Sequence, residues 1–255
     1  MLATRDALEC DGAVVLRDFL SADEIEKCRA LVKGVYDRLA AVGARGHPGL
    51  EHNFRTWNGV WLAEVGSYLS AESAALSKSY AELTETITRK LRRIAGSAWR
   101  YYPNRSYFRH YTGREELVPW HIDADAAGIG RDECINIWMP LQTVGNGLPS
   151  LEVVYGSHVA MRKLPSLTGE RRYRDDSFVA SIGQPTVIKL DPGDVLIFDQ
   201  HTLHRTQPHN GAFERTSCEF RFIVPTGWRR VLSVISPTWP PPALAGMTKV
   251  AAPSA

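Results

Sequence analysis

The chain has 255 residues and a formal net charge of +2, with charges of both signs spread along it. This length is sufficient for one domain with a sizeable core, and single β barrels or sandwiches often reach it. The balanced charge gives no electrostatic reason to expect a nucleic-acid or membrane partner, so small soluble ligands are the better expectation.

The four cysteines, Cys10, Cys28, Cys134 and Cys218, are far apart and form no CxxC pair. This distribution fits a reducing compartment. The first ten residues lack a long apolar segment, and no later run of about 18 apolar residues suggests a transmembrane span. We therefore expect a cytoplasmic protein.

Two long helices are expected before residue 96. Ser21 followed by Glu24 predicts a capping box, and the apolar residues after it recur at helical spacing until Gly43. A second helix is expected over about 71–95, where an apolar stripe again has helical spacing. Residues 44–70 between the two are expected to be irregular. Both helices are interpreted as scaffold.

From Trp99 to Val224 the apolar pattern changes to alternation, which predicts β-strands. In the segment 133–141, one face is apolar, and Asn136 and Trp138 lie on the other face. We expect the apolar face to pack beneath the helices or a second sheet. Asn136 and Trp138 would then line an interior that binds polar ligands, as in a barrel with a functional lumen.

A candidate metal site lies in the stretch 118–123. On an extended segment, alternate side chains point the same way, so His121 and Asp123 can present an imidazole and a carboxylate to one point. An HxD pair alone is weak evidence of a site. A second histidine from the segment 193–206 would complete the two-histidine, one-carboxylate facial triad of non-haem Fe(II) oxygenases.

Three later histidines compete for the third position. His204 shares a strand face with Thr206, and Arg215 follows His204 by 11 residues (215 minus 204). His201 falls in the expected turn. His158 follows a strand at a Gly-Ser bend and has no arginine at a useful distance after it. We favour His204, and part of the weight for this choice is the spacing in the family that the motifs resemble. Arg215 alone would prove nothing, because the polar face of the last strand can also be interpreted as exposed to solvent.

Together these motifs resemble the phytanoyl-CoA dioxygenase (PhyH) family of Fe(II)/2-oxoglutarate oxygenases. The resemblance rests on Pro-Trp-His121-Ile-Asp123, Gly-Ser-His158, Leu-His204-Arg-Thr206 and Arg215, and on an N-terminal segment over residues 11–20. It covers roughly residues 5 to 225. It implies a mainly β fold, with a double-stranded β-helix (jelly-roll, cupin-like) core and flanking N-terminal helices. We expect one domain over 1–235 and a Pro-rich tail over 236–255.

The resemblance also implies a chemistry that uses Fe(II), 2-oxoglutarate and O2. His121, Asp123 and His204 would hold the iron, and an unactivated C–H bond would be hydroxylated with release of succinate and CO2. Related halogenases have a small residue at position 123, so a carboxylate there favours hydroxylation. Arg215 suits the far carboxylate of 2-oxoglutarate, because a guanidinium binds it bidentately and stays charged, and Thr206 could add a hydroxyl donor. Further cosubstrate contacts are expected from Tyr107, Asn136 and Trp138.

The primary substrate is expected to be a small molecule. The charged segment 159–183 has a slight excess of positive charge, which hints that this substrate is anionic. Two alternatives stay open, a cupin-type metalloenzyme that does not use 2-oxoglutarate and a non-catalytic jelly-roll binding module. Neither alternative gives a reason for Arg215 at its distance from His204.

Overall fold

The computed structural model describes residues 2–43, 59–95, 99–103, 106–113, 117–127, 133–167, 169 and 173–224. The expected domain boundary at 235 and the tail 236–255 lie outside the described residues. The helices are α1 (Leu2–Asp11), α2 (Ala22–Val42), α4 (Leu62–Glu72), α5 (Ala74–Ala95), α6 (Asp123–Ala127), α7 (Ser157–Met161) and α8 (Asp176–Ile182). The strands are β1 (Ala13–Leu16), β2 (Gly59–Trp61), β3 (Arg100–Tyr101), β4 (Tyr107–Tyr111), β5 (Glu133–Pro140), β6 (Leu151–Val153), β7 (Thr186–Val187), β8 (Val195–Asp199), β9 (His204–Thr206) and β10 (Arg215–Val224).

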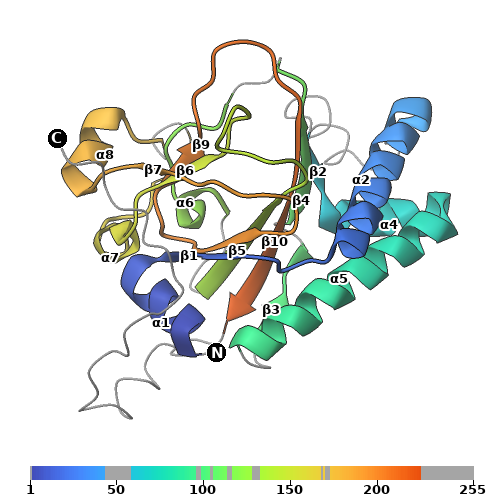
Figure 1. Ribbon diagram of the computed structural model, residues 1–255, viewed down its shortest axis with the longest axis horizontal. Helices are drawn as coiled ribbons and strands as arrows, with labels where there is room; N and C mark the ends of the chain where they lie inside the picture. Colours follow the sequence, from blue (N-terminus) through green and yellow to red (C-terminus); the bar gives the residue numbers. More distant parts are fainter. Residues whose placement is uncertain are drawn as a thin grey trace. The chain divides into compact units, whose positions relative to one another are not determined.

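Two antiparallel sheets form the body of the domain (Figure 1). The larger sheet has the order β1-β8-β5-β10-β4-β2, with β3 also paired to β10, and the smaller one has the order β7-β6-β9. Strands that are distant in the chain are neighbours in both sheets, as in a jelly roll. The expected fold, a mainly β double-stranded β-helix with N-terminal helices, is confirmed.

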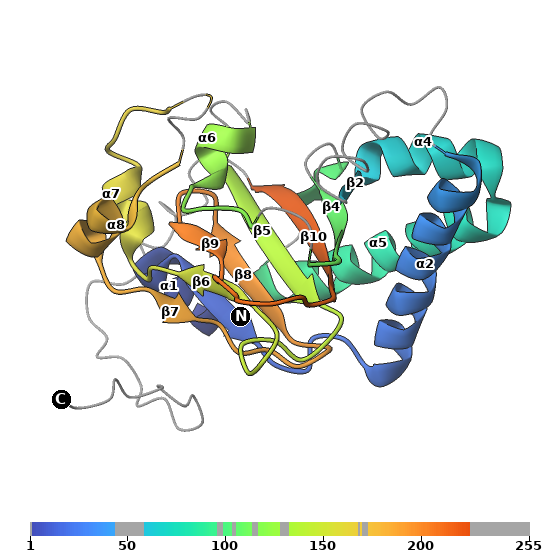
Figure 2. The same cartoon turned by 90° about the horizontal axis from the view of Figure 1, so that it is seen from above.

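Helices α2 and α5 lie against the outer face of the larger sheet, away from β6, β7 and β9 (Figure 2). The contact is tight, because Cys28 Sγ of α2 lies 3.6 Å from Cys218 Sγ of β10. Cys218 is paired with Met139 of β5, so the apolar face of β5 is on the same side. The prediction that this face packs beneath the helices is confirmed. All four cysteines are free thiols.

The N-terminal part of the chain follows the predicted boundaries at α2. The Ser21 hydroxyl accepts a hydrogen bond from Glu24 N, and the Glu24 carboxylate accepts one from Ser21 N, which completes the capping box. Gly43 ends the helix with a φ of +70°. No helix among the described ranges is long and apolar enough to cross a membrane.

Residues 62–95 form two helices, where one helix from about residue 71 and an irregular segment before it were predicted. Leu62, Val65 and Leu69 of α4 are buried at helical spacing, a signal that the sequence contains. The helical conformation is interrupted at Ser73. The Ser73 hydroxyl accepts a hydrogen bond from Leu76 N and so caps the start of α5. The rest of the segment expected to be irregular, 44–58, lies outside the described residues.

Candidate metal and cosubstrate site

The inner face of the larger sheet is lined by polar and charged side chains. β5 contributes Asn136 and Trp138, and both are buried. Glu219 and Arg221 of β10 face them across the pair β5–β10, and they are each 4% exposed. The polar face of β10 therefore lies inside the domain, and the alternative interpretation, exposure to solvent, does not hold. The prediction that Asn136 and Trp138 line a polar interior is confirmed.

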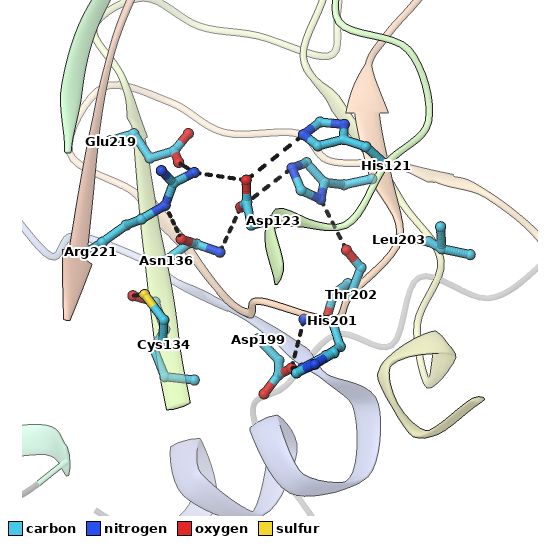
Figure 3. A network of polar contacts seen from close by, with 12 residues as sticks. His121, Asp123, Cys134, Asn136, Asp199, His201, Thr202, Leu203, Glu219 and Arg221 are labelled. Carbon is cyan, nitrogen blue, oxygen red and sulfur yellow. Dashed lines mark hydrogen bonds and ion pairs between the residues drawn. The ribbon is translucent and has the colours of Figure 1, made fainter. Parts of the chain in front are cut away.

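His121, Asp123 and His204 lie together in this interior. Figure 3 shows two of them, His121 and Asp123, facing each other. Each offers one donor atom, and the three donor atoms are within 4.8 Å of one another. His121 Nε2 is 3.8 Å from Asp123 Oδ1, and His204 Nε2 is 3.7 Å from Asp123 Oδ2. All three residues are buried. Two imidazoles and one carboxylate at these separations can hold one divalent metal ion.

The backbone brings these residues together in a way that differs from the predicted extended segment. His121 and His204 form an isolated antiparallel bridge, in which each backbone N–H donates to the other residue's carbonyl, at 3.0 and 3.1 Å. Asp123 is not on a strand but is the first residue of α6. Ala124 N donates to Gln200 O at 3.0 Å and thereby ties this turn to the segment before His204.

Backbone carbonyls orient both imidazole rings. His121 Nδ1 lies 2.8 Å from Pro119 O, and His204 Nδ1 lies 3.0 Å from Thr202 O. A ring nitrogen that faces a carbonyl oxygen carries the hydrogen, so each Nε2 has its lone pair free for a metal. Burial, together with His204, lowers the pKa of His121 to about 3. His121 is therefore neutral, the form in which an imidazole binds metal.

Asp123 is held by a buried network of hydrogen bonds. Asn136 Nδ2 donates to its Oδ2 at 2.8 Å, and Arg221 Nη2 donates to its Oδ1 at 2.7 Å. Arg221 Nε also donates to Asn136 Oδ1 at 2.6 Å, so the three side chains fix one another. Burial by itself would raise the pKa of Asp123, but the neighbouring Arg221 guanidinium, which donates a hydrogen bond to it, is the main cause that lowers it. The carboxylate stays ionised.

The same network extends to Glu219 and Tyr107. Arg221 Nη2 forms an ion pair with Glu219 Oε1 at 2.5 Å, and Tyr107 Oη donates to Glu219 Oε2 at 2.5 Å. Burial raises the pKa of Glu219. Tyr107 and Asn136 were expected to contact the cosubstrate. The structure places the Asn136 amide on Asp123 and Arg221, and the Tyr107 hydroxyl on Glu219.

Arg215 lies deeper along the same face and is 1% exposed. Its Nη1 donates to Pro149 O at 2.8 Å, and its Nε has no hydrogen-bond partner among the described residues. Its guanidinium carbon is 4.9 Å from the Tyr111 ring centroid and 5.4 Å from that of Trp138. Burial lowers the pKa of Arg215 to about 10, so it is charged at neutral pH.

No carboxylate within the described part of the chain lies at ion-pair distance from Arg215. A buried guanidinium without a counterion is costly unless an anionic ligand completes it. Thr206 is also buried, and its side chain is close enough to the Tyr111 hydroxyl to influence the pKa of that group. The structure thus brings Arg215, Thr206 and Trp138 together around Tyr111, and this group fits a dicarboxylate ligand.

The other two candidate histidines lie outside the cluster. His201 Nδ1 is 3.1 Å from Asp199 Oδ1, on the loop before His204. His158 is buried, and its Nε2 lies 3.1 Å from Glu9 O, where it fixes the N-terminal helix to the body. Neither histidine belongs to a group of potential metal ligands among the described residues.

The charged segment 159–183 contains arginines with carboxylate partners. Arg162 forms an ion pair with Asp199 at 2.6 Å, and Arg174 forms one with Asp125 at 3.0 Å. These two guanidinium groups are therefore neutralised within the protein. They do not supply the free positive charge from which an anionic substrate was inferred.

Sequence reasoning missed Arg221 as a site residue. The signal was present, since Arg221 alternates with Arg215 and Glu219 on one face of the last strand. Asn136 on the neighbouring strand is paired with Arg221 in the sheet, but that register cannot be derived from either segment alone.

Comparisons with known proteins agree with this geometry. The family model of phytanoyl-CoA dioxygenase (PhyH) matches residues 8–217. AviO1 from Streptomyces viridochromogenes Tue57 is 17% identical with a TM-score of 0.62, over 88% of this chain and 95% of that chain. EctD from S. alaskensis, solved with 2-oxoglutarate and 5-hydroxyectoine, is 18% identical with a TM-score of 0.61, over 88% and 76%. The epimerase SnoN, in complex with Fe3+, alpha ketoglutarate and nogalamycin RO, is 19% identical with a TM-score of 0.61, over 88% and 83%.

At these identities the solved structures establish a shared fold. No curated protein matches the chain in sequence. The family model spans most of the chain. The matched residues include the metal cluster (His121, Asp123 and His204) and Arg215. The chain therefore belongs to the phytanoyl-CoA dioxygenase (PhyH) family and is an enzyme of the 2-oxoglutarate-dependent dioxygenase type.

Proposed function

We propose that the enzyme hydroxylates an unactivated C–H bond of a small-molecule substrate and converts 2-oxoglutarate to succinate and CO2. The observation that carries the proposal is that one interior contains both the cluster His121, Asp123 and His204 and the buried Arg215, which has no carboxylate partner among the residues that the structure describes. The first group fits a ferrous ion and the second fits the far carboxylate of the cosubstrate.

His121 and His204 would bind the metal through Nε2, and Asp123 through its carboxylate. Iron bound there would supply the activation of dioxygen, a redox chemistry that amino-acid side chains lack. The protein's part is to hold three ligands on one side of the metal, so that the remaining positions are open. The carboxylate at position 123 fills the place where a halogenase has a small residue, which favours hydroxylation.

Arg215 would bind the far carboxylate of 2-oxoglutarate through the edge of its guanidinium group. The rings of Tyr111 and Trp138 lie near it and help to keep water from this end of the interior. Thr206 would add a hydroxyl contact. Asn136 and Tyr107 would act through Asp123, since their polar atoms engage Asp123 and Glu219.

The two alternative functions account for less of the geometry. A cupin-type metalloenzyme that does not use 2-oxoglutarate has a use for the three metal ligands but none for the buried Arg215. A non-catalytic jelly-roll module has a use for neither feature. Both alternatives predict that 2-oxoglutarate does not bind in an Arg215-dependent way.

The test is anaerobic addition of Fe(II) and 2-oxoglutarate to the purified protein. We expect a weak visible charge-transfer band that saturates with 2-oxoglutarate. In Arg215→Ala, the iron should stay bound while the affinity for 2-oxoglutarate falls by about 10-fold or more, because a charge-assisted bidentate contact is lost.

His201→Ala is the matched control, since His201 is near the metal cluster in sequence but is not part of it. It should give the same band and the same affinity as the wild type. Absence of any band in the iron-containing wild type, or an unchanged affinity in Arg215→Ala, would contradict the proposal.

A further inference from the structure

A second arginine on the inner face, Arg109, also has no carboxylate partner in the described part of the chain. Arg109 lies on β4 between Tyr107 and Tyr111, and it is paired in the sheet with Ser217 of β10. Its Nη1 donates to Tyr111 Oη at 3.0 Å. Its Nε is buried without a hydrogen-bond partner, and no carboxylate of the described ranges lies at ion-pair distance from it.

Two aromatic rings hold the Arg109 guanidinium in place. Its central carbon is 4.7 Å from the centroid of the Tyr107 ring and 5.5 Å from that of Tyr111. Cation–π contacts of this kind fix the plane of a guanidinium and leave its edge free for hydrogen bonds. The nearest acidic group on this face, Glu219, is already engaged by Arg221 and by the Tyr107 hydroxyl.

The charges of the interior do not balance without a further anion. Among the described residues of the inner face, the guanidinium groups of Arg109, Arg215 and Arg221 are opposed by the carboxylates of Asp123 and Glu219. These three positive charges exceed the two negative charges by one. A divalent metal ion and the dianion 2-oxoglutarate cancel each other, so adding both leaves this excess unchanged. One further negative charge would neutralise the loaded interior.

The positions of the two unpaired arginines assign them to different ligands. Arg215 is almost completely buried, whereas Arg109 is partly exposed to solvent. Of the two guanidinium groups, that of Arg109 is therefore the more accessible to a ligand from solvent. Arg109 is also next to Tyr107, whose hydroxyl contacts Glu219 and so adjoins the network that holds Asp123.

We propose that Arg109 binds an anionic group of the primary substrate, a carboxylate or a phosphate, and thereby places the rest of that molecule beside the metal. This inference rests on the proposed function, since it takes Arg215 as the cosubstrate anchor. Arg109 is then a substrate-binding residue that selects anionic molecules over neutral ones of the same shape.

The test uses acetate as the probe, because it presents a carboxylate whatever the shape of the true substrate. The protein is saturated anaerobically with Fe(II) and 2-oxoglutarate, and the relaxation of the acetate methyl protons is measured by NMR as acetate is added. Paramagnetic iron should enhance that relaxation if acetate is held near it, and acetamide should give much less enhancement. In Arg109→Gln the apparent affinity for acetate should fall by about 10-fold or more.

Three comparisons make the outcome decisive. Arg109→Lys keeps the charge but loses the planar fork, and it should retain part of the acetate affinity. Arg92→Gln, which removes one exposed positive charge from the last turn of α5, should behave as the wild type. The affinity for 2-oxoglutarate, measured first in every variant, should be lost in Arg215→Ala and retained in Arg109→Gln.

Failure of this inference is distinguishable from failure of the proposed function. If the wild type does not bind 2-oxoglutarate, the proposed function fails. If 2-oxoglutarate binds but acetate gives no more enhancement than acetamide, or the same enhancement in Arg109→Gln, the role of Arg109 is wrong. If Arg109→Gln lost as much 2-oxoglutarate affinity as Arg215→Ala, Arg109 would be a cosubstrate contact. That result would also overturn the inference that Arg109 binds the primary substrate.

Discussion

Arg221 holds two buried carboxylates at once. Its guanidinium donates to Asp123 and forms an ion pair with Glu219, and its side chain is only 5% exposed. A buried ion pair is not strongly stabilising overall, but removal of one partner leaves an uncompensated charge in the interior. In this site, loss of Arg221 would leave two such carboxylates.

We expect Arg221→Met to lower the free energy of unfolding of the metal-free protein by about 3–5 kcal/mol. Urea denaturation measures this change. Lys27→Met is the control, because its ion pair with Asp23 lies on the exposed surface of α2 and should contribute little. If both variants unfold at the same urea concentration as the wild type, Arg221 does not hold Asp123 in the way described.

The difference between Arg215 and Arg221 shows how far single residues could be predicted. Arg215 was identified because a known family has an arginine at that distance from a histidine. Arg221 lies on the same face of the last strand as Arg215. Alternation with a period of two residues identifies that face, but it does not show whether the face is solvated or lies in the interior. Only the register with β5, which places Arg221 opposite Asn136, distinguishes the two.

At the scale of elements, the turn between α1 and β1 supports the segment that carries His204. Gly12 has a φ of +73° and its carbonyl accepts hydrogen bonds from Asp199 N and Thr202 Oγ1, both at 2.8 Å. A Cβ at this position would lie 2.8 Å from Thr202 Oγ1 and still closer to the ring of His158. Glycine is therefore required both by the backbone conformation and by the close approach of two side chains.

Gly12→Ala should lower the free energy of unfolding by about 2 kcal/mol or more, because left-handed strain and steric overlap add. Gly156→Ala is a matched control, since Gly156 has a φ of +76° but no atom within 4 Å of the point that an added Cβ would occupy. It should cost only about 1 kcal/mol, the strain alone. Thermal or urea unfolding of both variants measures the difference, and equal losses would show that the close packing at Gly12 contributes nothing.

The elements themselves were predicted unevenly. The start of α2 could be predicted because its capping box is a local signal, in which Ser21 and Glu24 satisfy each other's backbone groups. The turn into α6 at Asp123 could not, because Trp120 to Asp123 has the alternation of a strand and becomes helical only through tertiary contacts such as Ala124 N to Gln200 O.

At the scale of the whole molecule, the site depends on segments that are far apart in the chain. The bridge between His121 and His204 joins the loop before α6 to β9, and β10 brings Arg215 into the same interior. No local pattern specifies this convergence. Alternation in the sequence suggested His121 and Asp123, and the choice of His204 as the third ligand drew in part on the spacing of a known family. The long-range antiparallel pairing of the two sheets then places them within 4.8 Å of one another.

The most direct test of the central claim is the iron content of single variants after anaerobic addition of Fe(II) and removal of unbound metal. The wild type should retain about one iron per chain, as expected for a single facial triad. Asp123→Ala and His204→Ala should retain almost none, while His201→Ala and His158→Ala should retain most of it. Loss of iron in His201→Ala with retention in His204→Ala would contradict the assignment of the metal ligands.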